Sequence, residues 1–268
     1  MKKRIAMIGA GLSGLTAACR LHEDFEVSVF EQSQVPGGRS ATCYAHPYAF
    51  DHGAQFFIVK DHRVQAFIKP MLAAGIIAPW HARFVEMRGQ ERVASRHWCD
   101  DYPHYVGTPG MDAIGAYLAD KLQVHYACCV AKIEQCHRQW QLYDAQGGAL
   151  GGYDWVLLSL PVVQTLALLP NVFIWKQMLS RFSMKACYSL MLGFAPGFDL
   201  GFDAARIGDA SISWLSANHS KPGRHTPPAY VIHATNAWAD EHLNLAKKEV
   251  EHVMLSETKR VFGDCMGD

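Results

Sequence analysis

The stretch RIAMIGAGLSGLTAACRLHEDFEVSVFE, residues 4–31, decides the fold of the first part of this chain. It starts with a short apolar run at 4–8, as expected of a strand that is buried on both faces. The glycine pattern G-x-G-x-x-G at 9–14 follows at once, and apolar residues then recur at helical spacing. A second strand-like run at 25–30 ends at Glu31. This order of strand, glycine loop, helix, strand and acid predicts a Rossmann-like dinucleotide-binding unit.

Each glycine of the pattern has a physical role in binding a dinucleotide. Gly9 permits the tight turn out of the strand, Gly11 lets backbone N–H groups approach a pyrophosphate, and Gly14 lets the helix pack on the sheet. Glu31 can accept hydrogen bonds from an adenosine ribose. Its carboxylate would repel a 2′-phosphate, so we expect a nucleotide that lacks one.

Two further glycine-containing loops follow closely, VPGGRS at 35–40 and FDHGAQFF at 50–57. A plain NAD domain would run straight into its next helix and strand. Here Gly38 would allow close backbone approach, Arg39 could neutralise a pyrophosphate, and Gly53 could leave room for a flat ring system. The loops therefore favour FAD. Two ordinary glycine turns with a surface arginine are the alternative.

The composition excludes several classes of protein. Of 268 residues, 50% are hydrophobic and 19% charged, which indicates a globular chain with a sizeable core. Twenty-five basic residues balance 25 acidic ones, so a general nucleic-acid footprint is absent. The longest later apolar run, 156–170, is broken by Pro161, and we therefore expect no membrane span. The lack of a targeting segment favours the cytoplasm.

Five potential zinc ligands lie close together in the sequence, namely His125, Cys128, Cys129, Cys136 and His137. Their spacing fits no standard zinc pattern, and the stretch also has strand character, in which neighbouring side chains face opposite ways. We therefore expect reduced cysteines and no metal.

The remaining pattern predicts elements along the whole chain. Helical apolar spacing predicts helices over 61–74, 111–122 and 241–260. Strands are expected over 124–133, 139–144, 153–160, 187–194 and 229–234, with a hairpin at Gly147-Gly148. No linker or internal repeat separates two domains, so we expect them to interleave.

The motifs GAGLSG, PGGRSAT and FDHGAQFF resemble those of the flavin-containing amine oxidase superfamily, whose members use FAD. Within it, four later segments resemble the renalase-type branch, at 105–111, 159–161, 213–222 and 233–238.

The resemblance implies an α/β fold in which a Rossmann-like FAD-binding domain interleaves with an α+β substrate domain on a mixed or antiparallel sheet. We expect the FAD-binding domain at 1–76 and 107–161 and the substrate domain at 77–106 and 162–268. Chains of this kind continue with a Gly-Asp strand and helix that return to the flavin. This sequence stops at Asp268, so we expect that return to be absent.

Site residues follow from the resemblance position by position. It implies cofactor contacts at Gly9, Gly11, Leu12, Gly14, Glu31, Gln32, Gly38, Arg39, Ser40, Gln55, Phe56 and Val130. Gln55 and Phe56 would lie near the isoalloxazine and the backbone of Val130 near the adenine. Substrate contacts are expected at Tyr105 and Tyr188, while His52 and His233 receive no proton-transfer role. Lys221 and Arg224, in a loop rich in proline and glycine, are expected at a solvated surface.

The activity implied is oxidation of dihydronicotinamide isomers of NAD(P)H to NAD(P)+. Hydride would pass to flavin N5 and then to dioxygen, giving hydrogen peroxide. Two alternatives stay open, a flavin amine oxidase that acts on another small amine and a truncated homologue without activity. The expected partners are a small-molecule substrate and dioxygen, with no nucleic acid and no membrane.

Overall fold

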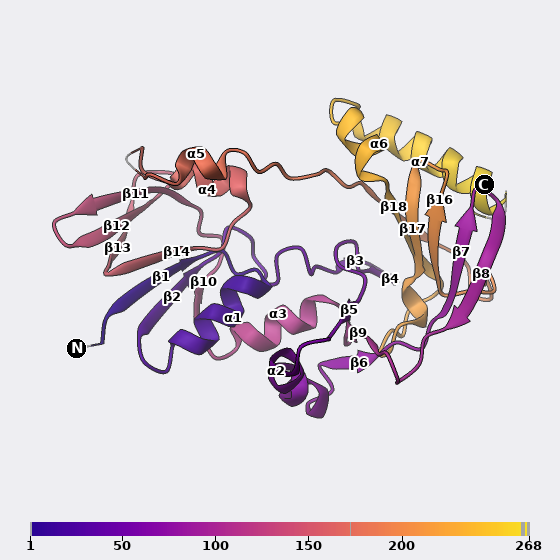
Figure 1. Cartoon of the computed structure of the whole chain (residues 1–268), viewed down its shortest axis with the longest axis horizontal. Helices are drawn as coiled ribbons and strands as arrows, with labels where there is room; N and C mark the ends of the chain where they lie inside the picture. Colours follow the sequence, from indigo (N-terminus) through magenta and orange to yellow (C-terminus); the bar gives the residue numbers. More distant parts are fainter. Residues whose placement is uncertain (1, 172, 264–265, 267–268) are drawn as a thin grey trace. The chain divides into compact units, whose positions relative to one another are not determined.

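A computed structural model describes residues 2–171, 173–263 and 266, and they form two compact units (Figure 1). The first unit comprises Met1–Ser40 and Asp112–Met184, and the second comprises Ala41–Met111 and Lys185–Asp268. The chain thus passes from the first unit to the second and back, as the expected interleaving requires. The boundaries between the compact units lie near residues 40, 111 and 184. The expected FAD-binding and substrate domains are defined by function instead, and their bounds stay a prediction.

A parallel sheet of four strands forms the centre of the first unit. Its order is β10-β2-β1-β14, with β1 at Arg4–Ile8, β2 at Glu26–Phe30, β10 at Gln123–His125 and β14 at Trp155–Leu158. The central strand β1 is buried from its second residue onward, which explains its continuous apolar run. Helices α1 (Leu12–Leu21) and α3 (Asp112–Ala119) contact each other in this unit. The predicted Rossmann-like arrangement is confirmed.

A second sheet of three antiparallel strands follows, β11 (Val130–Cys136), β12 (Gln139–Asp144) and β13 (Ala149–Tyr153). The hairpin at Gly147-Gly148 joins β12 to β13, as predicted. Ile133, Leu142 and Tyr153 pack with Ile8 and Phe30 in one buried cluster. Helices α4 (Val162–Leu168) and α5 (Lys176–Leu179) complete the unit.

The single strand predicted over 124–133 is wrong. Strand β10 ends at His125, and β11 begins in a different sheet at Val130. Between them Ala127 has a left-handed backbone (φ 50°), and its N–H donates to the Ser33 carbonyl at 2.9 Å. Apolar residues continue through this turn, so hydrophobicity alone does not reveal the break.

The second unit is built on a mixed sheet of six strands in the order β15-β18-β17-β16-β7-β8. Only β16 and β7 are parallel; the other neighbouring pairs are antiparallel. The strands are β7 (Arg83–Arg88), β8 (Glu91–His97), β15 (Ser189–Gly193), β16 (Ala204–Gly208), β17 (Ile212–Ala217) and β18 (Ala229–Ala234). This confirms the expected mixed sheet.

The second unit also contains two smaller sheets and two further helical elements. A two-stranded sheet pairs β3 (Cys43–Ala45) with β4 (Tyr48–Phe50), and a three-stranded one has the order β5-β9-β6. Its strands are β5 (Phe57–Ile58), β6 (Ile77–Pro79) and β9 (His104–Gly107). Helix α2 (His62–Ala73), capped by the Asp61 side chain, and the short 3-10 helix η1 (Asn218–Ser220) complete the set.

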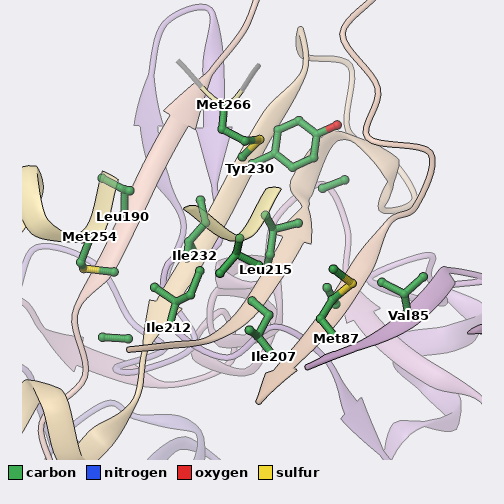
Figure 2. Packing of buried hydrophobic residues seen from close by; sticks show 14 of the residues in the cluster. Val85, Met87, Leu190, Ile207, Ile212, Leu215, Tyr230, Ile232, Met254 and Met266 are labelled. Carbon is green, nitrogen blue, oxygen red and sulfur yellow. The ribbon is translucent and has the colours of Figure 1, made fainter. Parts of the chain in front are cut away.

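Helices α6 (Asn236–Glu241) and α7 (Lys247–Phe262) lie against one face of the six-stranded sheet (Figure 1). Figure 2 shows Met254 of α7 near Leu190, Ile212 and Ile232 of the sheet. The single helix predicted over 241–260 is wrong at its start. The Glu249 carboxylate accepts a hydrogen bond from the Ala246 N–H at 3.0 Å, and this bond begins a new helix.

In the part of the chain that the structure describes, no helix has the length and apolar character needed to cross a membrane.

Candidate functional site

The first and third glycines of the G-x-G-x-x-G pattern, Gly9 and Gly14, lie where the backbone leaves no room for a side chain. Gly9 has φ +101°, and a Cβ there would lie 2.5 Å from the Ser159 carbonyl oxygen. A Cβ at Gly14 would lie 2.1 Å from the Gly9 carbonyl oxygen. The loop is also held by the Gly9 N–H, which donates to the Phe30 carbonyl at 2.8 Å. These glycines set the turn and the close packing of α1.

Gly11 has a different environment. It is the N-cap residue of α1, with extended backbone, and no side chain caps the helix there. A Cβ at Gly11 would meet nothing within 4 Å. The first turn of α1, which begins at Leu12, contains no acidic residue. The positive end of the helix dipole therefore meets open space, as an anion-binding helix start requires.

The Pro-Gly-Gly loop packs directly on this glycine loop. The Gly37 N–H donates to the Ala10 carbonyl at 2.8 Å, and Gly37 forms an isolated bridge with Gly11. A Cβ at Gly38 would lie 3.1 Å from the Gly11 Cα, and one at Gly115 of α3 would lie 2.6 Å from the Gly37 Cα. Backbone thus meets backbone on both sides of the loop, which larger residues would prevent.

The two residues after this loop differ in exposure. Arg39 is exposed, whereas Ser40 is buried and its N–H donates to the Gly37 carbonyl at 3.1 Å. The Arg39 guanidinium is therefore free of the tight loop packing and can reach an anion in solvent.

Glu31 directly follows β2, and its side chain contacts the glycine loop. Its Oε2 accepts a hydrogen bond from the Ala10 N–H at 2.8 Å, and its Oε1 accepts from the N–H and the hydroxyl of Ser33 at 2.9 and 2.7 Å. The side chain is buried, while its neighbour Gln32 is exposed. A carboxylate offers about four acceptor positions, so it retains capacity for a ribose hydroxyl. The Cys128 N–H donates to the Glu31 carbonyl at 2.9 Å, two residues before buried Val130.

These features fit a dinucleotide. An uncapped helix start, an open position at Gly11 and a buried acid at the end of the second strand are what a pyrophosphate and a ribose need. The structure brings the expected contacts from Gly9 to Ser40 together in the first unit. Their role as cofactor contacts, like that of Val130, stays a prediction.

The second unit contains a buried ionic cluster, which we define as Asp51, Lys221 and Arg224. Asp51 Oδ2 lies 3.0 Å from Lys221 Nζ and 2.6 Å from an Arg224 guanidinium nitrogen. Its Oδ1 accepts hydrogen bonds from the Thr42 hydroxyl at 2.7 Å and the Met111 N–H at 3.0 Å. The Arg224 guanidinium also donates to the carbonyls of Gly107 and Pro222. All three charged side chains are fully buried or nearly so.

Burial and charge act in opposite directions on the pKa values of this cluster. Burial raises the pKa of Asp51, but Lys221, Arg224, the Met111 N–H and the Thr42 hydroxyl outweigh it and hold the pKa at about 2. Burial lowers the pKa of Lys221 to about 8, since attraction to Asp51 is partly cancelled by repulsion from Arg224. The Asp51 carboxylate is thus the shared counter-charge of both cations.

The expectation that Lys221 and Arg224 lie at a solvated surface is wrong. The Lys221-Pro-Gly-Arg224 turn folds inward because Gly223 adopts φ +74°, and both basic side chains reach the single carboxylate of Asp51. Sequence reasoning missed the cluster because Asp51 lies 170 residues from Lys221. The only local signal is Asp51 itself, an acid inside the apolar stretch around Phe50 and Phe56.

Gln55 joins this cluster to a histidine. Its Oε1 accepts from the Ser216 hydroxyl at 2.6 Å and from Lys221 Nζ at 3.3 Å, and its Nε2 donates to the carbonyls of Asp51 and Gly53. His233 Nε2 lies 3.4 Å from Gln55 Nε2. Burial lowers the pKa of His233 to about 4, with repulsion from Lys221 and His52 adding to the effect, so its ring is neutral at neutral pH.

Phe56 belongs to an aromatic group with Trp98, His104 and Trp214. Its ring centroid lies 4.9 Å from that of Trp98, 5.0 Å from that of His104 and 5.6 Å from that of Trp214. Trp98 and His104 stack at 3.7 Å with nearly parallel planes, and burial lowers the pKa of His104. Within this group Phe56 is tilted against the other three rings, and Trp98 is buried.

The two expected substrate residues lie on different parts of the second unit. Tyr105 lies on β9 with its ring 5.7 Å from that of Phe57. Tyr188, just before β15, donates its hydroxyl to the His242 carbonyl at 3.2 Å and packs against Trp238. Their substrate role stays a prediction.

Among the described residues, no group of three or more His, Cys, Asp or Glu side chains is arranged to hold a metal ion. His125 instead stacks on Phe30 at 4.9 Å. Of residues 263–268, Gly263 and Met266 are described and the others lie outside the described residues, so the expected absence of a return to the flavin stays a prediction.

Comparison with known proteins agrees with this geometry. The family model described as an NAD(P)-binding Rossmann-like domain matches residues 7–70. A zeta-carotene-forming phytoene desaturase from Myxococcus xanthus is 40% identical over 60 residues, which are 22% of this chain and 12% of that protein. The match thus spans only a small part of either chain.

Solved structures are similar over almost the entire chain. A putative protoporphyrinogen oxidase from Exiguobacterium sp. 255-15 has a TM-score of 0.79 at 12% identity, covering 98% of this chain and 84% of that one. Cyclohexylamine oxidase from Brevibacterium oxydans IH-35A has a TM-score of 0.74 at 14% identity, covering 100% and 83%. Putrescine oxidase with bound putrescine has a TM-score of 0.73 at 11% identity, covering 99% and 83%.

The chain therefore has a Rossmann-like dinucleotide-binding domain within a flavin amine oxidase-like fold. Together with the glycine loops, these similarities support FAD as its cofactor.

Proposed function

We propose that this chain is an FAD-dependent oxidoreductase. The observation that carries the proposal is the Pro-Gly-Gly loop packed backbone to backbone on the glycine loop, beside the open N-terminus of α1 at Gly11. The names of the similar proteins, two amine oxidases, a protoporphyrinogen oxidase and a desaturase, support redox chemistry. FAD, when bound, supplies hydride acceptance and subsequent reaction with dioxygen.

The chain's own residues bind and orient the reactants in this proposal. Gly11 and Leu12 present the helix start to the pyrophosphate, Glu31 receives the ribose, and Arg39 neutralises phosphate charge. Gln55 and Phe56 contact the isoalloxazine. Tyr105 and Tyr188 contact the substrate, and the aromatic group around Phe56 excludes water.

The substrates we propose first are dihydronicotinamide isomers of NAD(P)H, oxidised to NAD(P)+ with hydrogen peroxide as the second product. The partly exposed rings of Phe56 and Trp214 suit a planar substrate. A small amine is the second candidate, favoured by the similarity in fold to putrescine oxidase and cyclohexylamine oxidase.

Turnover under air tests both candidates. The purified chain is loaded with FAD, and the 2- and 6-dihydro isomers of NADH, putrescine and cyclohexylamine are each added while peroxide is measured. We expect peroxide in proportion to oxidised dihydronicotinamide. Peroxide from an amine alone would replace the first candidate by the second. FAD-loaded protein that oxidises none of them would support the inactive homologue and contradict the proposal.

A further inference from the structure

The side-chain amide of Gln55 is held in one orientation by the groups around it. Its Oε1 faces two donors, the Ser216 hydroxyl and the Lys221 ammonium, while its Nε2 faces the carbonyls of Asp51 and Gly53. A lysine ammonium can only donate and a backbone carbonyl can only accept. Exchanging the amide oxygen and nitrogen would therefore place donors against donors and acceptors against acceptors.

This orientation constrains the neighbouring imidazole of His233. Both hydrogens of Gln55 Nε2 are used by backbone carbonyls, so none is available for His233 Nε2 at 3.4 Å. The same ring nitrogen lies 3.2 Å from the His52 carbonyl oxygen. Without a hydrogen, Nε2 would direct its lone pair at that oxygen. It must therefore carry the hydrogen and donate it to His52.

The opposite ring nitrogen then has no hydrogen. The ring is neutral because burial and the charge of Lys221 lower its pKa to about 4. A neutral imidazole with hydrogen on Nε2 has a lone pair on Nδ1. The polar contacts of the His233 ring both involve Nε2, and Nδ1 is not among the fully buried side-chain atoms that lack a partner. Nδ1 therefore retains some solvent contact and has no hydrogen-bond partner among the described residues.

We propose that His233 Nδ1 is a hydrogen-bond acceptor for an N–H group of the substrate, with Gln55 and the His52 carbonyl as the groups that position it. The substrate part rests on the proposed function, and it fits both candidates because a nicotinamide carboxamide and a protonated or neutral amine each present N–H donors. The tautomer itself does not depend on that function.

Two titratable groups act on the His233 ring, Lys221 and His52. Lys221 repels a second proton on His233, as does His52. Lys221 is in turn held by Asp51 and lies over the Trp80 ring at 5.4 Å, so its charge is fixed in place. The His233 acceptor therefore persists from about pH 5 upward, since the lowered pKa of about 4 keeps the ring unprotonated there.

Nitrogen-15 NMR of histidine-labelled, FAD-loaded chain at pH 7 tests the tautomer. The His233 signals are assigned by their loss in His233→Gln, which keeps a donor for the His52 carbonyl. We expect Nε2 at the shift of a protonated nitrogen and Nδ1 at that of an unprotonated one. The reverse pattern, or an averaged pair of shifts, would overturn the tautomer.

Titration with NAD+, the product of the first proposed reaction, tests the acceptor. Binding is followed by flavin fluorescence. We expect the Nδ1 chemical shift to move toward the value of a hydrogen-bonded nitrogen, while that of Nε2 changes less. Binding that leaves Nδ1 unmoved would overturn the acceptor role. If neither NAD+ nor putrescine binds, the acceptor role fails together with the proposed substrates, and the tautomer measurement is unaffected.

Two substitutions distinguish a substrate contact at Nδ1 from a purely structural role of His233. His233→Asn retains an oxygen near the place of Nδ1, whereas His233→Gln retains only the donor near Nε2. We expect His233→Gln to raise KM about tenfold with kcat within about twofold, and His233→Asn to raise it less. Equal KM values in both variants and in the unchanged chain would contradict the proposal.

Discussion

Asp51 and Lys221 form an ion pair at 3.0 Å across 170 residues of sequence, with both side chains fully buried. The pair ties the segment Ala41–Met111 to the segment Lys185–Asp268 inside the second unit. Arg224 adds a second cation to the same carboxylate oxygen. Removing the carboxylate would leave two buried positive charges beside each other, so the cluster is a sensitive point of the fold.

Asp51→Asn is therefore expected to destabilise the chain by about 3–5 kcal/mol, because it leaves both cations without a counter-charge. Urea unfolding followed by circular dichroism measures the loss. The double variant Asp51→Asn/Lys221→Met removes one of the stranded charges and should recover part of it. A single variant within about 1 kcal/mol of the unchanged chain would show that the ion pairs are not formed.

Gly11 and Gly14 separate cofactor binding from folding. A methyl group at Gly11 meets open space, so Gly11→Ala should leave the melting temperature of the apoprotein within a few degrees while FAD binding weakens at least tenfold. A methyl group at Gly14 would lie 2.1 Å from the Gly9 carbonyl oxygen, and Gly14→Ala should fail to fold stably. Thermal melts and flavin fluorescence titrations measure the two effects. Unchanged FAD affinity in Gly11→Ala would place the cofactor elsewhere.

Glu31→Gln tests whether the buried carboxylate holds the glycine loop. The amide has one acceptor oxygen, so its NH2 group must face either the Ala10 N–H or the Ser33 N–H. We expect about 1–3 kcal/mol of lost stability and weaker FAD binding. The exposed neighbour gives the control, since Gln32→Ala should change stability by less than about 0.5 kcal/mol. Equal effects at both positions would argue against the role of Glu31.

His233 should contribute to loss of stability in mild acid. Its pKa is about 4 in the folded chain and near 6.5 when unfolded, so the unfolded chain binds more protons between these values. Stability from this group is thus complete above about pH 6.5 and falls by about 3 kcal/mol as the pH drops to about 4. Comparing urea unfolding of the unchanged chain and His233→Gln across this range isolates the contribution. Parallel pH curves for the two would contradict the lowered pKa.

The local elements of the first unit follow from sequence because their signals are local. The strand, glycine loop, helix and second strand at 4–31 all form within one residue or two of their expected bounds. The break at Ala127 and the separate starts of α6 and α7 were missed, since a left-handed residue and the side-chain bond from Glu249 to Ala246 leave no trace in hydrophobic periodicity.

The candidate site divides in the same way. Motif spacing predicted the loop at Gly9–Gly14 and the acid at Glu31, whose contacts lie close in sequence or across adjacent strands. The buried cluster depends on pairing Asp51 with Lys221 and Arg224, which no single-sequence pattern encodes. A basic residue in a turn rich in proline and glycine is usually solvated, and only the fold shows that Lys221 is not.

The central claim, that the first unit binds FAD, is tested most directly by the visible absorption spectrum of the purified chain after addition of FAD and desalting. We predict flavin bands that persist at close to one FAD per chain, and bands that are lost in Gly11→Ala although it folds. A colourless chain with the same far-ultraviolet circular dichroism, retaining no FAD at any concentration tested, would contradict the account.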